Sequence, residues 1–312
     1  LASRHQISLW ARDPAQSRML AVDRINARYL PDVALPGGVL VTSELPLAIE
    51  NGELIVVAVP TSALRETMRL IVSAGSTAGV VWLCKGFESG SAKFPHEVVE
   101  EELRSGQPCA ALSGPSFASE VARGLPAAVT LASHDPQFAA LASRELHTGR
   151  LRVYSSDDLV GVETGGAVKN VIAIAAGVCD GLKLGASARA ALITRGLAEM
   201  TRLGVRLGGR AETFMGLAGG GDLMLTATSD LSRNRRVGLQ LALGRPLAAI
   251  LAELGHVAEG VYTAREVLRI SKQLGVDMPI ASAVSQLLDG TTSAQELVES
   301  LLQRGPKSES VG

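Results

Sequence analysis

The sequence predicts an α/β fold in two parts, a parallel-sheet domain over residues 1–156 and an all-helical domain over residues 157–304. Two observations support this prediction. In the first half, short apolar runs alternate with helical patterns, whereas after about residue 157 the strand-like runs stop and helical periodicity continues. A length of 312 residues is also ordinary for two domains. Residues 305–312 are polar and are expected to form a disordered tail.

Six runs in the first half are expected to be strands. The clearest is the fully apolar run 54–59, which is typical of a strand buried on both faces, and Pro60 after it suits the first turn of a helix. The other five are residues 7–10, 79–84, 110–112, 127–132 and 151–154. Strands that alternate with helices imply a parallel sheet with helices on both faces.

The second half is expected to be helical throughout. Apolar residues recur there at helical spacing, and Ser293 with Glu296 forms a capping box that begins a last helix. The other expected helices are residues 160–178, 188–207, 235–243, 246–254, 261–274 and 279–288.

Composition excludes several classes of protein. Hydrophobic residues make up 46% and aromatic residues only 3%, so the core must be built mainly from Ala, Val, Leu and Ile. A net charge of −1 argues against a nucleic-acid footprint over the whole surface, although a local basic pocket remains possible. No apolar run approaches the ~18–20 residues of a membrane span. Three cysteines without CxxC spacing favour reduced thiols in the cytoplasm, and the histidines show no metal-binding spacing.

Polar residues follow three of the expected strands. Arg12, Lys85 and the segment 114–116 each come directly after a strand, and ligands of doubly wound sheets bind beyond the carboxyl ends of the strands. Their position predicts a nucleotide or phosphate crevice. Arg12 would suit the 2′-phosphate of NADP, but the neighbouring Asp13 weakens that interpretation, since an acidic residue suits the ribose of NAD.

Lys169 stands in Gly-Gly-Ala-Val-Lys-Asn at the head of an apolar helix. A lysine there is costly unless something pairs with it, and Asp222 after the glycine run 219–221 could be that partner. Asp222 and Thr226 are four residues apart and so face the same side of a helix. A purely structural role explains both residues equally well at this point: Lys169 could extend from the helix to solvent, and Asp222 could be a helix N-cap.

A dense basic run, Ser-Arg-Asn-Arg-Arg at 232–236, follows Asp222. Arginine offers a fork of N–H donors that matches a phosphate, so the run predicts a phosphate site. The alternative is a solvated basic turn, and at least one of the three arginines is expected to face water. Together with Lys169, the run suggests an enzyme that holds a small phosphorylated substrate and moves a proton.

Ten stretches, in order along nearly the whole chain, match one known family. They are residues 9–14, 26–31, 57–60, 85–86, 114–118, 165–171, 192–199, 221–223, 232–236 and 257–260. With these motifs the chain resembles the bacterial NAD(P)-dependent glycerol-3-phosphate dehydrogenases, and the Lys-Asn and Ser-Arg-Asn-Arg-Arg motifs are the most specific.

The resemblance implies a Rossmann-like dinucleotide-binding domain and a helical substrate domain. It implies reversible hydride transfer between NADH or NADPH and dihydroxyacetone phosphate, which gives sn-glycerol 3-phosphate for glycerophospholipid synthesis. It also implies a cytoplasmic enzyme that can form a homodimer and in which Lys169 exchanges a proton with the C2 oxygen of the substrate.

The other site residues come from the same resemblance. Thr226 matches a polar site position of the related eukaryotic enzymes, which makes its assignment a weaker one. Those expected around the substrate are Lys85, Gly114, Ser116, Asp222, Ser232, Arg233 and Asn234. Those expected at the cofactor are Arg12, Lys85, Ala118, Arg233, Val257 and Glu259.

One departure from the family pattern concerns the start of the chain. Members open with a strand and a GxGxxG-type turn that holds the pyrophosphate, and no such segment precedes Leu1. We therefore expect the native chain to continue upstream and the 312-residue chain to bind the cofactor poorly. Two alternatives stay open: a reductase of another phosphorylated or carboxylated keto substrate, or an inactive fragment that only binds a ligand or partner. The basic run beside Asp222 favours phosphate.

Overall fold

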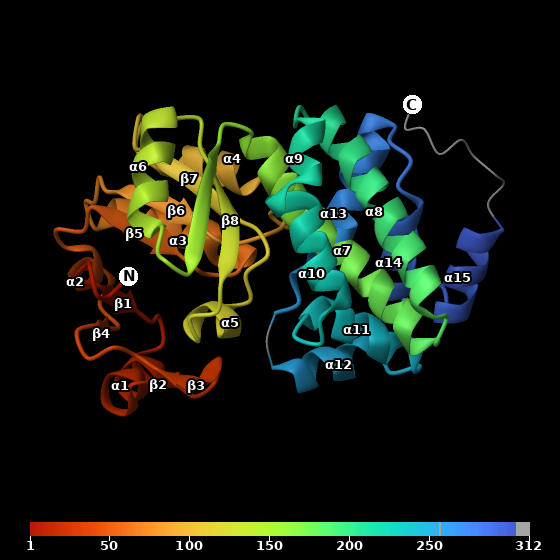
Figure 1. Cartoon of the computed structure of the whole chain (residues 1–312), viewed down its shortest axis with the longest axis horizontal. Helices are drawn as coiled ribbons and strands as arrows, with labels where there is room; N and C mark the ends of the chain where they lie inside the picture. Colours follow the sequence, from red (N-terminus) through yellow and green to blue (C-terminus); the bar gives the residue numbers. More distant parts are fainter. Residues whose placement is uncertain (256, 304–312) are drawn as a thin grey trace.

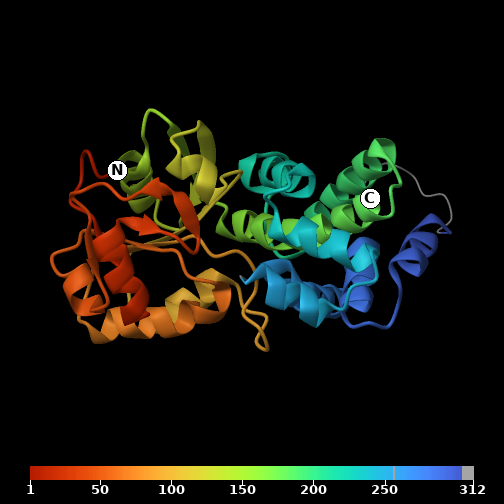
Figure 2. The same ribbon diagram turned by 90° about the horizontal axis from the view of Figure 1, so that it is seen from below.

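The computed structural model describes residues 1–255 and 257–303. A sheet domain and a helical domain lie side by side, and they remain so when the molecule is seen from below (Figures 1 and 2). The expected boundary at 156/157 falls between the last strand, β9 (Leu151–Ser156), and the long helix α7 (Leu159–Gly181). The expected tail, 305–312, lies outside the described residues.

Five strands form the main sheet in the order β5-β6-β7-β8-β9. The first four are β5 (Leu54–Val57), β6 (Gly79–Trp82), β7 (Cys109–Ser113) and β8 (Ala127–Ala132). The sheet is parallel except at β7 and β8, which run antiparallel, so the expectation of a parallel sheet is wrong at this one pair. The connection there holds only the five-residue helix α5 (Ala118–Ala122), whereas a parallel crossover usually carries a full helix.

The other crossovers carry such helices. They are α3 (Leu64–Ser73), preceded by the 3₁₀ turn Thr61–Ala63, α4 (Pro95–Glu102) and α6 (Pro136–Leu146). Apolar side chains of the sheet and of these helices are buried together, among them Trp82 of β6, Met68 of α3 and Phe138 of α6. This packing fixes the carboxyl ends of β5, β6 and β7 at one edge of the domain.

The first fifty residues form a separate layer beside β5 (Figure 1). The expected strand at 7–10 is present as β1 (Ser8–Trp10), but it pairs with β4 (Leu40–Thr42) and not with the five-stranded sheet. A hairpin of β2 (Ile25–Asn26) and β3 (Leu30–Ala34) was not expected from the sequence. These short strands lack the alternation of apolar and polar residues by which strands are recognised. Tertiary contacts therefore determine that these segments are strands. Helices α1 (Pro14–Asp23) and α2 (Leu45–Ile49) complete the layer, and Asp13 caps α1 by accepting from the Ala15 amide at 2.8 Å.

Helix α7 is the centre of the second domain. The helices around it are α8 (Ala186–Arg206), α9 (Ala211–Met215), α10 (Asp222–Thr228), α11 (Arg233–Ala242), α12 (Leu247–Leu254), α13 (Glu259–Leu274), α14 (Pro279–Leu288) and α15 (Ala294–Leu302). The capping box expected at Ser293 and Glu296 is present. Glycines let α7 and α11 meet backbone to backbone, because a Cβ added to Gly177 would lie 2.0 Å from the Arg235 carbonyl oxygen.

Within the described part of the chain, α7 is the one helix long and apolar enough to cross a membrane by length and composition. The window that meets this test is, however, 94% buried inside the protein. The helix also carries the buried polar residues Glu163 and Lys169. It is therefore the core helix of this domain.

Candidate active site

A carboxylate shared by two lysines lies where the two domains meet. Lys169 on α7 is only 6% exposed, and its Nζ donates to Asp222 Oδ1 at 2.8 Å and to Thr226 Oγ1 at 2.9 Å. Lys85 Nζ donates to the other oxygen, Asp222 Oδ2, at 2.6 Å. The pairing of Lys169 with Asp222 that the sequence suggested is thus present, and Thr226 joins it from the same face of α10.

Glycines bring these elements together. A Cβ on Gly165 would lie 2.6 Å from the Ala218 carbonyl oxygen, and one on Gly166 would lie 2.9 Å from Ser113 Oγ. Residues Leu217–Gly221 form a single π-helical turn, a feature frequent at functional sites, and α10 starts directly after it. Asp222 makes no side-chain cap there, so the alternative reading of this residue as an N-cap is wrong.

Lys85 reaches this group from the edge of the sheet. It follows β6, and its Nζ also donates to the Gly114 carbonyl oxygen at 3.2 Å. Gly114 follows β7 with a φ of +143°, and a Cβ there would lie 2.9 Å from Val129 Cα, so only glycine fits. Ser116 Oγ donates to the same carbonyl at 3.2 Å. The carboxyl ends of β6 and β7 therefore meet α7 and α10. Of the three polar signals expected together after the strands, Lys85 and the segment 114–116 lie together, whereas Arg12 follows β1, which pairs outside this sheet.

The charged groups in this site shift one another's pKa values. Burial is the largest cause that lowers the pKa of Lys169; Asp222 opposes it, Lys85 adds to it, and the resulting pKa is about 8. Burial alone would raise the pKa of Asp222, but the two lysines outweigh it and hold that pKa below its usual range. The site therefore contains a lysine that can gain and lose a proton near neutral pH beside a carboxylate that stays charged.

A second group lies at the start of α11. Asn234 Nδ2 donates to Asn170 Oδ1 at 2.9 Å, and Asn234 Oδ1 accepts from the Gly260 amide at 3.0 Å. The Ser232 hydroxyl caps α11 by accepting from the Arg235 amide at 3.2 Å. Since Asn170 follows Lys169, this group adjoins the lysine.

The three arginines of the basic run differ in their surroundings. Arg235 is buried and pairs with Asp180 and Asp230, which makes it a structural residue. Arg236 is exposed. Arg233 makes no hydrogen bond or ion pair with any residue in the ranges 1–255 and 257–303, and partial desolvation lowers its pKa although the residue as a whole is exposed. Partial desolvation distinguishes it from the exposed Arg236 and makes it the arginine of the run better suited to bind an anion.

Glu259, at the start of α13, lies close enough to Arg233 for their charges to interact. Its Oε1 accepts from the Thr61 amide at 3.2 Å, which links α13 to the carboxyl end of β5. Burial raises the pKa of Glu259, while Thr61 and Arg233 oppose that rise. This carboxylate therefore also lies at the junction of the domains.

Three expected cofactor residues lie apart from the lysines. Arg12 is exposed beyond β1, with its Nη1 3.7 Å from Glu66 Oε2. Ala118 is exposed at the start of α5, and Val257 is half-buried just before α13. Among the residues that the structure describes, no hydrogen bond joins these three to the group around Lys169.

Sequence reasoning missed Ser113, the last residue of β7. It is 6% exposed, and within the described chain its hydroxyl has no hydrogen-bond partner. A buried hydroxyl without a partner is unfavourable unless a ligand supplies one. Its position directly before Gly114, at the carboxyl end of a strand, is the signal by which it could have been found.

Comparison with known proteins agrees with this geometry. The family models for the N-terminus and C-terminus of NAD-dependent glycerol-3-phosphate dehydrogenase match residues 1–139 and 158–299. The chain is 59% identical over 308 residues to glycerol-3-phosphate dehydrogenase [NAD(P)+] of Nitrosospira multiformis, covering 99% of this chain and 92% of that one. It is 56% identical to the enzyme of the same name from Dechloromonas aromatica, covering 99% of this chain and 94% of that one.

A solved structure shows the same architecture. The crystal structure of glycerol-3-phosphate dehydrogenase from Coxiella burnetii superposes with a TM-score of 0.92 at 40% identity, covering 97% of this chain and 93% of that one. A ketopantoate reductase from Ralstonia solanacearum shares the fold at a TM-score of 0.57 and 18% identity. Two family models, close relatives and a superposable structure lead to one conclusion: the chain belongs to the family of NAD-dependent glycerol-3-phosphate dehydrogenases.

Proposed function

We propose that this protein catalyses the reversible reduction of dihydroxyacetone phosphate to sn-glycerol 3-phosphate with NADH or NADPH, a reaction that supplies glycerophospholipid synthesis. One observation supports this most directly. Lys169 is a buried lysine with a pKa of about 8, held by Asp222 and Thr226 where the sheet edge meets the helical domain. A group with such a pKa can give a proton in one direction and take it back in the other.

In this proposal the two lysines act on the reacting carbonyl. Lys169 donates its proton to the C2 oxygen as negative charge develops there, and it takes the proton back when the alcohol is oxidised. Lys85 adds a second positive charge, while the Gly114 carbonyl and Ser116 define the sheet side of the site. Asp222 orients both ammonium groups through its two oxygens.

We place the phosphate of the substrate at the start of α11. The Arg233 guanidinium, which makes no hydrogen bond or ion pair within the described residues, lies there, and Asn234 lies beside it, held by Asn170 and Gly260. Ser232 caps the same helix, whose N-terminal amides favour an anion. Binding energy from this remote group can then orient the carbonyl toward Lys169.

Several features of the junction fit a nicotinamide cofactor. The Ser113 hydroxyl, which has no hydrogen-bond partner among the described residues, lies at the carboxyl end of β7, where a dinucleotide lies in folds of this kind. The residues that would hold the cofactor are Arg12, Lys85, Ala118, Arg233, Val257 and Glu259. The bound nicotinamide supplies the hydride, and the protein supplies the proton and the orientation.

The first test is direct. Purified protein is mixed with NADPH or NADH and dihydroxyacetone phosphate, and the absorbance of the reduced cofactor is followed. At saturating cofactor, we expect turnover with this substrate and little with unphosphorylated dihydroxyacetone or with ketopantoate. Turnover with ketopantoate instead would favour a reductase of carboxylated substrates, and binding without turnover would favour an inactive binding protein.

We also propose a cytoplasmic homodimer. The three cysteines are free thiols, which fits a reducing compartment, and exposed methionines on the adjacent helices α9 and α10, Met215 and Met224, offer an apolar surface. Sedimentation equilibrium of the protein and of Met215→Ser with Met224→Ser tests the second point. A monomeric wild type would contradict it.

A further inference from the structure

The segment between β6 and α4 ties the sheet domain to the helical domain. We call residues 85–94 the strap. Lys85 at its start reaches Asp222, and both of its phenylalanines, Phe87 and Phe94, belong to the hydrophobic core of the helical domain, with ring centroids 5.0 Å apart. At its tip the Gly90 amide donates to Glu266 Oε1 at 2.9 Å. The strap therefore leaves one domain, packs on the other and returns.

Next to Lys85 the strap contains a glycine, Gly86, whose backbone is flexible. Gly86 adopts a φ of +141°, and a Cβ there would lie 2.7 Å from Thr263 Oγ1. Glycine at this position is required by the turn, but it does not hold the chain to one conformation. Lys85 itself has a long side chain, whose rotamer freedom opposes a fixed position for its ammonium group. Phe87, the residue after Gly86, is held in the core of the helical domain, and Glu88 beside it offers a further contact that can fix this end of the strap.

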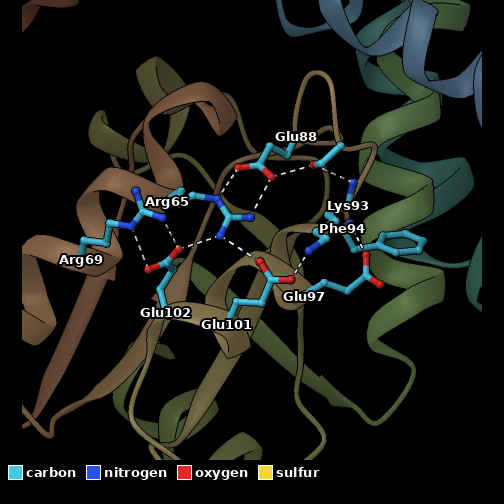
Figure 3. Close-up of polar contacts among 9 residues, drawn as sticks. Arg65, Arg69, Glu88, Lys93, Phe94, Glu97, Glu101 and Glu102 are labelled. Atoms are coloured by element: carbon cyan, nitrogen blue, oxygen red, sulfur yellow. Dashed lines mark hydrogen bonds and ion pairs between the residues drawn. The ribbon is translucent and has the colours of Figure 1, made fainter.

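Arg65 on α3 supplies that contact. Its Nε and Nη2 donate to the two oxygens of Glu88 on the strap, each at 2.8 Å, and its Nη1 donates to Glu102 at 2.6 Å (Figure 3). Glu101 lies 2.9 Å from the same Nη1. Figure 3 shows the guanidinium at the centre of these carboxylates. A bidentate pair fixes orientation as well as charge.

Arg65 is more buried than Arg69, the other arginine in this cluster. The side chains of Arg65, Glu88 and Glu102 are 23%, 19% and 14% exposed. Arg69, on the same helix, is 63% exposed and, among the residues that the structure describes, pairs with Glu102 alone. Exposed pairs contribute little, so the Arg65–Glu88 pair is the one expected to restrain the chain. The Ser91 hydroxyl donates to Glu88 at 2.6 Å and closes the tip of the strap onto the same carboxylate.

We propose that Arg65 is a positioning residue: by clamping Glu88 it fixes the strap and holds the Lys85 ammonium between Asp222 and the Gly114 carbonyl. This inference rests on the proposed function, because it assigns Lys85 its place in that reaction. Arg65 acts only through the strap and touches neither the lysines nor the expected substrate position.

The clamp has a consequence that a purely structural ion pair would not have. Lys85 lowers the pKa of Lys169, since two like charges share one carboxylate. If the strap loosens, Lys85 spends less time beside Lys169, and the pKa of Lys169 rises. Replacing Lys85 itself sets the limit of this effect.

The test uses five forms of the full chain: wild type, Arg65→Met, Glu88→Gln, Lys85→Met and the control Arg69→Met. For each, kcat and KM are measured across pH, and the pKa of Lys169 is followed by NMR after ¹³C-methylation of lysines. We expect Arg65→Met and Glu88→Gln to lower kcat roughly 3- to 30-fold. Both should raise the pKa of Lys169 in the direction of Lys85→Met but less far, and Arg69→Met should leave both quantities unchanged.

The double variant Arg65→Met with Glu88→Gln should be no worse than the poorer single variant, because both break one contact. The proposal is overturned if kcat falls while the pKa of Lys169 stays constant, or if Arg69→Met has the same effect as Arg65→Met. Thermal unfolding monitors folding, and Glu88→Gln replaces Arg65→Met if that variant does not fold. If wild type does not reduce dihydroxyacetone phosphate, the proposed function fails, whereas the NMR titration still decides whether Arg65 positions Lys85.

Discussion

At the scale of single residues, Asp222 makes the site possible. A carboxylate that is 2% exposed would be costly alone, and so would a lysine as buried as Lys169. Each offsets the cost of the other, and Lys85 brings a second cation that keeps the carboxylate charged. One lysine is left with a pKa near 8 as a result.

Lys169→Ala should remove most of the turnover while the protein still folds. Loss of a positioned general acid typically costs ~10²–10⁴-fold in kcat. In wild type, reduction needs the ammonium form and should decline as pH rises past about 8, whereas oxidation needs the neutral amine and should increase over the same range. Both limbs should vanish in the variant. The exposed Lys272→Ala is the control, and near-normal turnover by Lys169→Ala would show that this lysine is structural.

Arg233→Ala should weaken binding of the phosphorylated substrate. A charge-assisted contact is worth about 1.5–3 kcal/mol, so KM should rise roughly 10- to 150-fold. Arg236→Ala, three residues away and exposed, should change it little. Activity toward dihydroxyacetone, which lacks the phosphate, should be poor and equal in both variants. An equal loss for both substrates would contradict a phosphate role.

Arg12→Ala should affect NADPH more than NADH. An arginine after the strand β1 can bind the 2′-phosphate that only NADPH carries, and the pair with Glu66 at 3.7 Å is too exposed to hold it elsewhere. The ratio of kcat/KM for the two cofactors measures the effect, with Arg18→Ala on α1 as the control. An unchanged ratio would show that Arg12 does not contact the cofactor.

At the scale of helices and strands, close backbone contacts place the site. Gly165 on α7 meets the turn before α10, and that turn leads directly into Asp222. The glycine pair beside Lys169 is therefore explained by packing: it lets a neighbouring segment reach the lysine.

Gly165→Ala should lower both stability and kcat. Alanine favours a helix by about 1 kcal/mol over glycine. However, the new Cβ would lie 2.6 Å from the Ala218 carbonyl oxygen, and overpacking of this kind typically costs ~1–3 kcal/mol. Moving that turn also moves Asp222. Urea unfolding and steady-state kinetics measure the two effects. Gly149→Ala, where a Cβ would meet nothing within 4 Å, serves as the control and should change neither.

At the scale of the whole molecule, buried polar contacts join the domains. Glu163 on α7 accepts from Trp82 Nε1 at 2.9 Å and from the His96 amide at 3.0 Å, and its other oxygen lies 2.5 Å from His96 Nδ1. Trp82 and His96 belong to β6 and α4 of the sheet domain. Together with Phe87 and Phe94 of the strap, these contacts hold the carboxyl edge of the sheet against α7.

Glu163→Ala should destabilise the protein strongly. Removing one partner of a buried charged group typically costs ~3–5 kcal/mol, because the Trp82 and His96 donors are left unsatisfied. Another glutamate–histidine pair, Glu100 with His134 at 3.3 Å, is more than half exposed, so Glu100→Ala should cost less than about 1 kcal/mol. Denaturant unfolding compares the two. Equal losses would mean that Glu163 does not join the domains.

Local patterns in the sequence determined the plan of the protein. Helices such as α13 and α14 are periodic over several turns, so the expected ranges 261–274 and 279–288 agree closely with the structure. The motifs around Lys169 and Arg233 also identified the family, which the comparisons confirm. The roles of the individual site residues stay predictions.

Tertiary structure decided what no local pattern records. Lys85 and Asp222 are 137 positions apart, and Arg65 and Glu88 belong to different elements, so their contacts depend on how the sheet and helices pack. The antiparallel pair β7–β8 and the short strands β2, β3 and β4 arise in the same way. The sequence shows which side chains are available and which segments are helical or extended. Only the packed chain determines which of those side chains share a carboxylate, because that depends on distances between residues far apart in the sequence.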